Sequence, residues 1–275
     1  MGPTNPDISV IITVFNGDTT ILNTLNSIKG QTFKNYEIVI VNDGSTDNTK
    51  NVLENFKIDN KDLNIKIYNM NSMGRSKALN FALNKARSPY IANLDADDLW
   101  EKRHLDIQLN NIKENSEFGL ICTNFSLIIG NDIDNSINLI ENISNKIIDI
   151  THKVGRYNPV NHSSVIYKKK VIQDLGGYNE NFNKLIDYEL WVRLRMNKIK
   201  IGYFTGKTCI KRIHENQNFE NKKPYSYALS IFKLSFKALV SEKDYFGILF
   251  VLLKFLYGLF PQIIRQKLKK MILNK

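Results

Sequence analysis

The chain has 275 residues, of which 43% are hydrophobic and 11% aromatic, enough for a substantial core in one large domain, with or without an appendage. Its formal net charge of +11 is compatible with a nucleic acid, an anionic membrane or an anionic substrate as partner. The aromatic residues do not alternate with the basic ones as they would in a stacking platform. A nucleic-acid-binding protein is therefore disfavoured.

The cysteines and the first residues bear on the compartment. Cys122 and Cys209 lie in apolar, strand-like segments without metal-ligand spacing, which indicates buried free thiols in a reducing compartment. Residues 1–7 carry no basic segment, and the apolar run 8–15 is too short for a signal peptide. We therefore expect an unsecreted, cytoplasmic protein.

The first 125 residues alternate between strand and helix patterns. Apolar runs at 8–14, 37–41, 65–68, 90–94 and 119–124 predict strands, and amphipathic segments between them predict helices. The core face of the first helix is expected to be Ile21, Leu22, Leu25 and Ile28. Such alternation implies right-handed βαβ units and an α/β fold with a mostly parallel sheet, whose ligands bind at the carboxyl ends of the strands.

An acidic cluster directly follows the fourth expected strand. Asp95, Asp97 and Asp98 fall within four residues, and in extended backbone Asp95 and Asp97 project to the same side. Carboxylate oxygens are hard ligands that select Mg²⁺ or Mn²⁺, and substrate phosphates typically complete the coordination of such ions. Taken alone, the cluster is equally compatible with a solvated turn that caps the next helix.

The pattern loosens after about residue 126. Residues 130–145 are rich in Asn, Asp and Ile and look like an insertion. Residues 168–175 and 187–197 predict helices, and 199–205 and 208–213 predict two further strands.

The C-terminal fifty residues differ in kind. Residues 245–260 are almost wholly apolar but fall short of the roughly 20 residues needed to cross a bilayer. Residues 262–272 are apolar on one helical face and cationic on the other, as in an interfacial anchor on anionic lipid. The alternative is a helical pair that packs on the body of the protein or on another subunit.

Six segments, in order, resemble those of the inverting, nucleotide-sugar-dependent glycosyltransferases of family 2, which have a GT-A fold. The segments are SVIITVFN at 9–16, QTF at 31–33, EIVIVNDGSTD at 37–47, GRSKALN at 74–80, DADD at 95–98 and DYELWVRL at 187–194. The resemblance implies a nucleotide-sugar-binding α/β half at 1–125, with a Rossmann-like sheet flanked by helices. It also implies an acceptor-binding and catalytic-base half of the same domain at 126–214, followed by a helical, basic amphipathic tail at 215–275.

The resemblance also implies how the donor is bound. Phe15 would stack on the nucleobase, and Asp43 would accept a hydrogen bond from a base N–H, which favours UDP or dTDP. Asp43 could instead be a helix-capping residue, and Arg75, placed where the family directs a cation toward the diphosphate, could be a solvated charge. The expected nucleotide-binding residues are Thr13, Val14, Phe15, Asp43, Arg75 and Asp95, the last facing the ribose or a metal-bound water.

For the metal and the chemistry, the resemblance implies Asp97 as the direct ligand of Mn²⁺ or Mg²⁺, with Asp98 and His214 as further ligands. Asp187 is the expected base that takes the proton of the acceptor hydroxyl, a role typically worth 10²–10⁴-fold in rate. The family usually has Glu before this Asp, where this chain has Ile186. Residues 162–164 are expected to border the acceptor site.

We therefore expect an inverting transfer of a sugar to a hydroxyl of a glycan or lipid-linked glycan, in bacterial surface polysaccharide synthesis. The enzyme would be peripheral at the inner face of the cell membrane. The alternative is a non-catalytic relative that binds carbohydrate or acts as a scaffold, and the retention of the aspartates argues against it. A nicotinamide dehydrogenase or a nucleotidyltransferase would need a glycine-rich loop at 13–18, which the sequence lacks.

Overall fold

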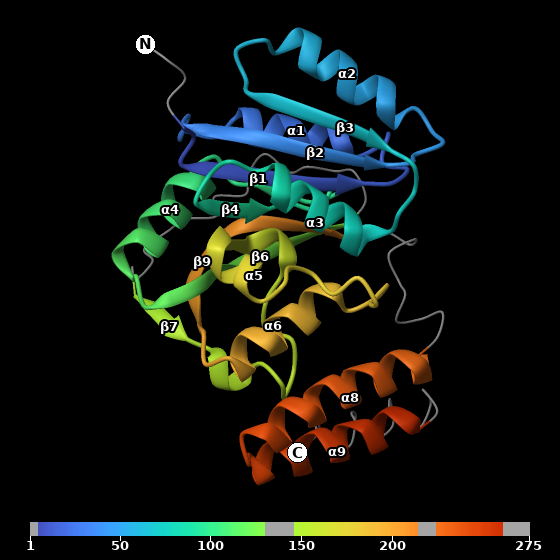
Figure 1. Cartoon of the computed structure of the whole chain (residues 1–275), viewed down its shortest axis with the longest axis vertical. Coiled ribbons are helices and arrows are strands. Elements are labelled where there is room, and N and C mark those ends of the chain that lie inside the picture. Colours follow the sequence, from blue (N-terminus) through green and yellow to red (C-terminus); the bar gives the residue numbers. More distant parts are fainter. Residues whose placement is uncertain (1–4, 130–145, 214–223, 261–275) are drawn as a thin grey trace.

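The centre of the molecule is a nine-stranded sheet with helices on both faces (Figure 1). The computed structural model describes residues 5–129, 146–213 and 224–260. In spatial order the strands are β3 (Ile65–Met70), β2 (Tyr36–Asp43), β1 (Ile8–Val14), β4 (Tyr90–Asn93), β8 (Val165–Lys168), β6 (Phe118–Ile129), β9 (Lys200–Ile213) and β5 (Leu99–Trp100), and β7 (Ile147–Asp149) pairs with β9.

The first four strands of this order are parallel, as the βαβ pattern predicts. The central strands β1 and β2 are buried on both faces because helices cover both sides of the sheet, whereas β3 lies at the edge and is only partly buried. One core lies between the sheet and α1 (Ile21–Lys29), α2 (Thr49–Asp59) and α4 (His104–Glu114). The other core lies between the opposite face and α3 (Arg75–Lys85), α5 (Lys169–Asp174) and α6 (Ile186–Met196).

Beyond β4 the sheet is mixed. β8 is antiparallel to both of its neighbours, β4 and β6, while the long pair β6 and β9 is parallel. β5 and β7 each add an antiparallel pairing to β9. The turn after β4 therefore lies against strands that come from the second half of the chain.

Three details of the sequence prediction differ from the structure. The expected strands at 199–205 and 208–213 form one continuous strand, β9. Leu22 is 47% exposed, and Thr24 is buried in its place, since its hydroxyl donates to the carbonyls of Ala96 and Asp98 at 3.0 and 2.9 Å. The short strand β8 was not predicted from the sequence. The expected insertion at 130–145 lies outside the described residues.

A pair of helices, α8 (Pro224–Ser241) and α9 (Tyr245–Leu259), lies against the end of the molecule that carries α6 (Figure 1). Buried Ala238 and Leu239 of α8 anchor the pair. None of the described helices is both long and apolar enough to span a membrane. The basic segment 262–272 lies beyond the described residues.

Candidate active site

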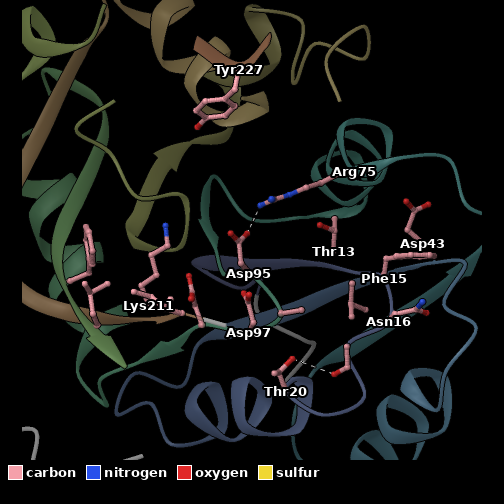
Figure 2. A pocket seen from close by; sticks show the side chains of 17 residues that line it. Thr13, Phe15, Asn16, Thr20, Asp43, Arg75, Asp95, Asp97, Lys211 and Tyr227 are labelled. Atoms are coloured by element: carbon pink, nitrogen blue, oxygen red, sulfur yellow. Dashed lines mark hydrogen bonds and ion pairs between the residues drawn. The ribbon is translucent and has the colours of Figure 1, made fainter. Parts of the chain in front are cut away.

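A cavity of about 760 Å³ opens at the carboxyl ends of β1, β2 and β4 (Figure 2). This volume is within the range of small-molecule sites. The structure brings eight of the predicted site residues to its wall. They are Thr13, Val14, Phe15, Asp43, Arg75, Asp95, Asp97 and Asp98. Asp187 does not line the cavity, and His214 lies outside the described residues.

The turn after β1 presents Phe15 to the cavity, where its side chain is 57% exposed. The next residue, Asn16, has a positive φ of 53°, a conformation that Asn tolerates better than most residues. The Asn16 N–H donates to Ser45 Oγ at 2.9 Å, and its side-chain oxygen accepts from the Thr46 N–H at 2.8 Å. These bonds tie the turns after β1 and β2 together, so the exposed ring is held in place as a platform for a planar ligand.

Asp43 ends β2 and is 6% exposed. Its two carboxylate oxygens accept hydrogen bonds from the backbone N–H groups of Met73 and Gly74 at 2.7 and 3.0 Å. Asp43 thereby fixes the segment that leads into α3 and Arg75. A carboxylate has about four lone-pair sites, so it can still accept from a further donor in the cavity.

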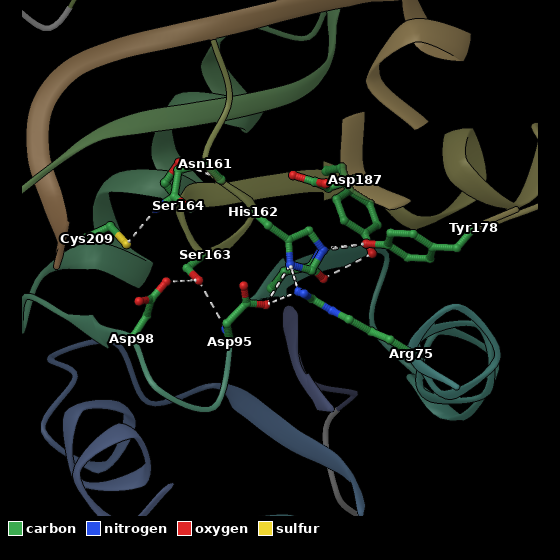
Figure 3. Close-up of polar contacts among 12 residues, drawn as sticks. Arg75, Asp95, Asp98, Asn161, His162, Ser163, Ser164, Tyr178, Asp187 and Cys209 are labelled. Atoms are coloured by element: carbon green, nitrogen blue, oxygen red, sulfur yellow. Dashed lines mark hydrogen bonds and ion pairs between the residues drawn. The ribbon is translucent and has the colours of Figure 1, made fainter. Parts of the chain in front are cut away.

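Arg75, Asp95 and His162 form a compact charged cluster (Figure 3). Arg75 Nη2 and His162 Nδ1 lie 2.5 and 2.8 Å from the same oxygen of Asp95. Burial alone would raise the pKa of Asp95, but the charge of Arg75 and the hydrogen bonds from Arg75 and His162 hold that pKa well below its usual range. The aspartate is therefore ionised, and Arg75 is aimed into the cavity beside it.

His162 continues the cluster into the protein interior. Its Nε2 lies 2.8 Å from Asn93 Nδ2 and 3.1 Å from the Tyr178 hydroxyl. Burial raises the pKa of Tyr178 to about 12, so this hydroxyl keeps its proton. A proton on His162 Nδ1 satisfies both sides, because Nδ1 then donates to Asp95 and Nε2 accepts from the buried donors. The network fixes the direction of the Asp95 carboxylate.

The rest of the acidic loop, residues 95–98, is held by hydrogen bonds from Ser163 and Arg212. Asp98 is 2% exposed and accepts hydrogen bonds from Ser163 Oγ at 2.5 Å and from the Arg212 N–H at 2.9 Å. Arg212 Nε also donates to the Asp97 carbonyl oxygen at 2.9 Å. Burial and the charges of Asp97 and Asp95 raise the pKa of Asp98 to about 8. Asp98 is therefore mostly protonated at neutral pH, and the held loop presents the Asp97 side chain to the cavity.

Asp187 lies in the first turn of α6, near the His162 side of the network (Figure 3). The residue before the helix, Leu185, has a left-handed φ of 55°, a strained conformation often found at functional sites. Asn158 Nδ2 lies 3.4 Å from Asp187 Oδ2. The negative charges of Asp95 and, less strongly, Asp187 raise the pKa of Arg75, so its guanidinium group stays charged.

The model of "Glycosyl transferase family 2" matches residues 9–175, more than half of the chain. The chain belongs to this family. An uncharacterized glycosyltransferase of Rickettsia bellii is 27% identical over 224 residues, which cover 81% of this chain. The match spans 31% of that relative's own length, so other parts of the relative have no counterpart here.

Solved structures agree on the fold of this family 2 glycosyltransferase. S. aureus TarS, in complex with UDP-GlcNAc, superposes with a TM-score of 0.68 at 19% identity, covering 92% of this chain and 72% of TarS. The mannosyltransferase PcManGT of Pyrobaculum calidifontis, in complex with GDP-Man and Mn²⁺, gives 0.62 at 18% identity, covering 90% and 74%. The expected GT-A α/β fold is confirmed.

The cavity and its surroundings include side chains that the sequence analysis did not single out. Lys211 on β9 and Tyr227 on α8 line the cavity, and Figure 2 shows them on different sides of it. Arg212, 1% exposed, clamps the acidic loop, while Asn93 and Tyr178 hold His162. Because side chains alternate between the two faces of a strand, the sequence of β9 could have indicated that Lys211 and Arg212 point in opposite directions, Lys211 toward the cavity and Arg212 inward. Nothing in the sequence pattern points to Tyr227.

Among the described residues, no group of three or more His, Cys, Asp or Glu side chains is arranged to hold a metal ion. Asp97 and Asp98 still fit a hard divalent cation by their chemistry, because Mg²⁺ sites commonly use one or two carboxylates and take the remaining ligands from water and substrate phosphates. A bound cation would favour the ionised form of Asp98, whose pKa is otherwise raised by burial and by the neighbouring carboxylates.

Proposed function

We propose that this glycosyltransferase is an inverting enzyme that moves a sugar from UDP or dTDP to a hydroxyl of a glycan or lipid-linked glycan. The single observation that carries the proposal is the cavity wall itself. It combines an exposed aromatic ring, Phe15, with the cation of Arg75 and the acidic loop at 95–98. These are the groups that a base, a diphosphate and a diphosphate-bound cation require.

The donor assignment rests on the two groups at the ends of β1 and β2. Phe15 offers a face for stacking, and Asp43 keeps acceptor capacity beside it. A carboxylate beside the base selects a ring with an N–H at its edge, as uracil and thymine have. TarS has been crystallised with UDP-GlcNAc and PcManGT with GDP-Man, so the fold accommodates more than one base.

Two cations face the position proposed for the diphosphate. Arg75 is held by Asp95, and Lys211 reaches the cavity from β9. Both would offset the charge that develops on the leaving nucleoside diphosphate. When Mn²⁺ or Mg²⁺ is bound, it would be held by Asp97 and Asp98 and would act as a Lewis acid on the diphosphate.

Asp187 is proposed to remove the proton of the acceptor hydroxyl as that oxygen attacks the anomeric carbon. Its position in the first turn of α6, outside the donor cavity, suits a base that approaches from the acceptor side. Attack from the face opposite the diphosphate inverts the configuration. His162 and Tyr178 would act by holding Asp95 and, through it, Arg75.

The cellular setting is also part of the proposal. We propose a role in bacterial surface polysaccharide synthesis, with the enzyme cytoplasmic and peripheral at the inner face of the membrane. The basic excess of residues 242–275, which includes seven Lys or Arg against two acids, supports contact with anionic lipid. A non-catalytic, carbohydrate-binding scaffold is disfavoured because the chain keeps both the acidic loop and the proposed base, Asp187.

A thermal-shift panel tests the donor proposal. UDP, dTDP, GDP and ADP are added with and without Mn²⁺, and a ligand at 100 times its Kd should raise the Tm by roughly 5–10 °C. We expect UDP or dTDP with Mn²⁺ to give the largest shift and Phe15→Ala to abolish it. Tyr157→Ala, which removes an exposed aromatic side chain that does not line the cavity, is the matched control. A panel in which no nucleotide shifts the Tm would refute the proposal.

A further inference from the structure

The helix pair α8–α9 exposes an unusual amount of apolar surface. The exposed side chains of α9 include Tyr245, Phe246, Leu249, Phe250, Leu253 and Leu256, between 44% and 75% exposed. The buried residues of this 15-residue helix are Gly247 and Val251. α9 therefore meets the rest of the protein along one narrow stripe and turns most of its circumference outward. Contiguous apolar patches of this kind mark interaction surfaces in soluble proteins.

The charges around this surface are almost all positive. Four lysines of the pair are exposed: Lys233, Lys237, Lys243 and Lys254. The sequence places two acids between residues 224 and 260, and both are engaged by arginines of the catalytic body. Glu242 contacts Arg195 at 2.5 Å, and Asp244 contacts Arg156 at 2.8 Å. An apolar surface bordered by lysines complements an anionic lipid headgroup layer.

The same charges disfavour a second copy of the chain as the occupant. A two-fold interface would place the same patch against itself, and so would bring lysines toward lysines. The length of α9 also decides how lipid would be met. Fifteen residues at 1.5 Å per residue give about 22 Å, short of the hydrocarbon core of roughly 30 Å. The helix would thus lie in the plane of the interface.

The helix pair is fixed to the catalytic body. α8 packs against α6, and the Tyr188 hydroxyl on α6 lies 2.9 Å from Ser235 Oγ on α8. α6 carries Asp187 in its first turn, and the start of α8 contributes Tyr227 to the cavity wall. α9 therefore has a fixed orientation relative to the cavity and to the proposed base, Asp187. If α9 lies on a surface, that surface takes the same fixed orientation.

From these observations we propose that α9 and the exposed face of α8 dock in the headgroup region of an anionic bilayer. Docking would hold the Tyr227 side of the cavity close to the surface where a lipid-linked acceptor presents its sugar. This orientation rests on the proposed function, in which the acceptor is lipid-linked. The docking surface is formed by α8 and α9, and the basic segment at 262–272 lies outside the described residues.

Vesicle flotation of the full chain tests the proposal. One vesicle population is phosphatidylcholine alone, and the other is an equal mixture of phosphatidylcholine and phosphatidylglycerol. We expect binding to the anionic vesicles, weakened by salt, and a loss of at least about tenfold in the partition coefficient for Leu249→Glu/Leu253→Glu. The matched control, Leu22→Glu/Ile58→Glu, adds the same charge at exposed apolar positions of α1 and α2 and should float like the wild type.

Three outcomes would overturn the docking surface. The first is that the wild type floats with neither vesicle. The second is that the α9 variant floats as well as the wild type. The third is that no form floats and light scattering shows a dimer that the α9 substitutions dissociate. Thermal shift with UDP is measured on the same proteins. Flotation without any nucleotide binding would leave the docking surface standing and refute the proposed donor site, so the two failures are distinguishable.

Discussion

Replacing the proposed base, Asp187→Asn, separates chemistry from binding. The amide has nearly the same size as the carboxylate, and its oxygen can still accept the hydrogen bond from Asn158. Leu190, Trp191 and Leu194 are fully buried and anchor α6 independently of residue 187. Loss of a negative charge at the start of a helix costs about 0.3–1 kcal/mol. We therefore expect a folded variant whose free energy of unfolding falls by about 1 kcal/mol or less.

The rate should fall far more than the stability. A positioned general base contributes about 10²–10⁴-fold, which corresponds to roughly 3–5 kcal/mol in the activation free energy. Because Asp187 does not line the donor cavity, the Kd for the nucleotide should change by no more than about threefold. The loss should therefore appear in kcat and leave donor binding almost unchanged.

The assay measures sugar transfer from the preferred donor to membrane-extracted glycolipids, with the Kd for UDP measured by calorimetry on the same preparation. Asp174→Asn is the matched control, since its side chain is 60% exposed on α5 and is paired with exposed Lys170. Transfer by Asp187→Asn within a few-fold of the wild type would refute the assignment of the base. A parallel loss of nucleotide binding would show that Asp187 serves the donor site.

Three further substitutions probe other parts of the structure. Lys211→Met should weaken UDP binding about tenfold, measured by calorimetry, because it removes the proposed charge-assisted contact to the diphosphate. Lys207→Met, on the exposed side of β9, is the control and should leave UDP binding unchanged. Equal effects of the two substitutions would contradict the assignment of Lys211. Glu37→Gln should lower the urea unfolding free energy by about 2–4 kcal/mol, since the fully buried Glu37 carboxylate accepts from Lys66 and Arg87, and an unchanged midpoint would refute this. Burial lowers the pKa of His104 to about 3 from 6.5, so below pH 6.5 the unfolded chain binds a proton that the native state does not. His104 should therefore lower the free energy of unfolding by up to about 1.4 kcal/mol per pH unit between pH 6.5 and 3. His104→Gln should make the measured dependence shallower by that amount, and an unchanged slope would contradict this.

The sequence predicts the first half of the fold well because local pattern decides it. The strands at 8–14 and 90–94 are apolar runs covered on both faces, and their order along the chain dictates the parallel sheet. The convergence of Phe15, Asp43 and the acidic loop follows from that topology. The fold class and the family were therefore accessible from the residues.

The second half was less predictable because long-range pairing determines it. β8 has four residues, and its place between β4 and β6 depends on partners of Ile166 that are 74 residues away at Ala92 and 45 residues away at Ile121. The burial of Asp98 depends on Ser163 and Arg212, which no local pattern connects to it. Local spacing could indicate a polar cluster in the acidic loop but not which carboxylate faces the cavity.

The hydrogen bonds that hold the acidic loop make the first half of the α/β domain, up to about residue 125, depend on the second half. The loop belongs to the first half, but the hydroxyl of Ser163 and the backbone and guanidinium of Arg212 that hold it come from the second. A fragment cut near residue 125 would retain β1 to β4 and lose the groups that hold the acidic loop. The wall of the cavity is therefore complete only when β8 and β9 have joined the sheet.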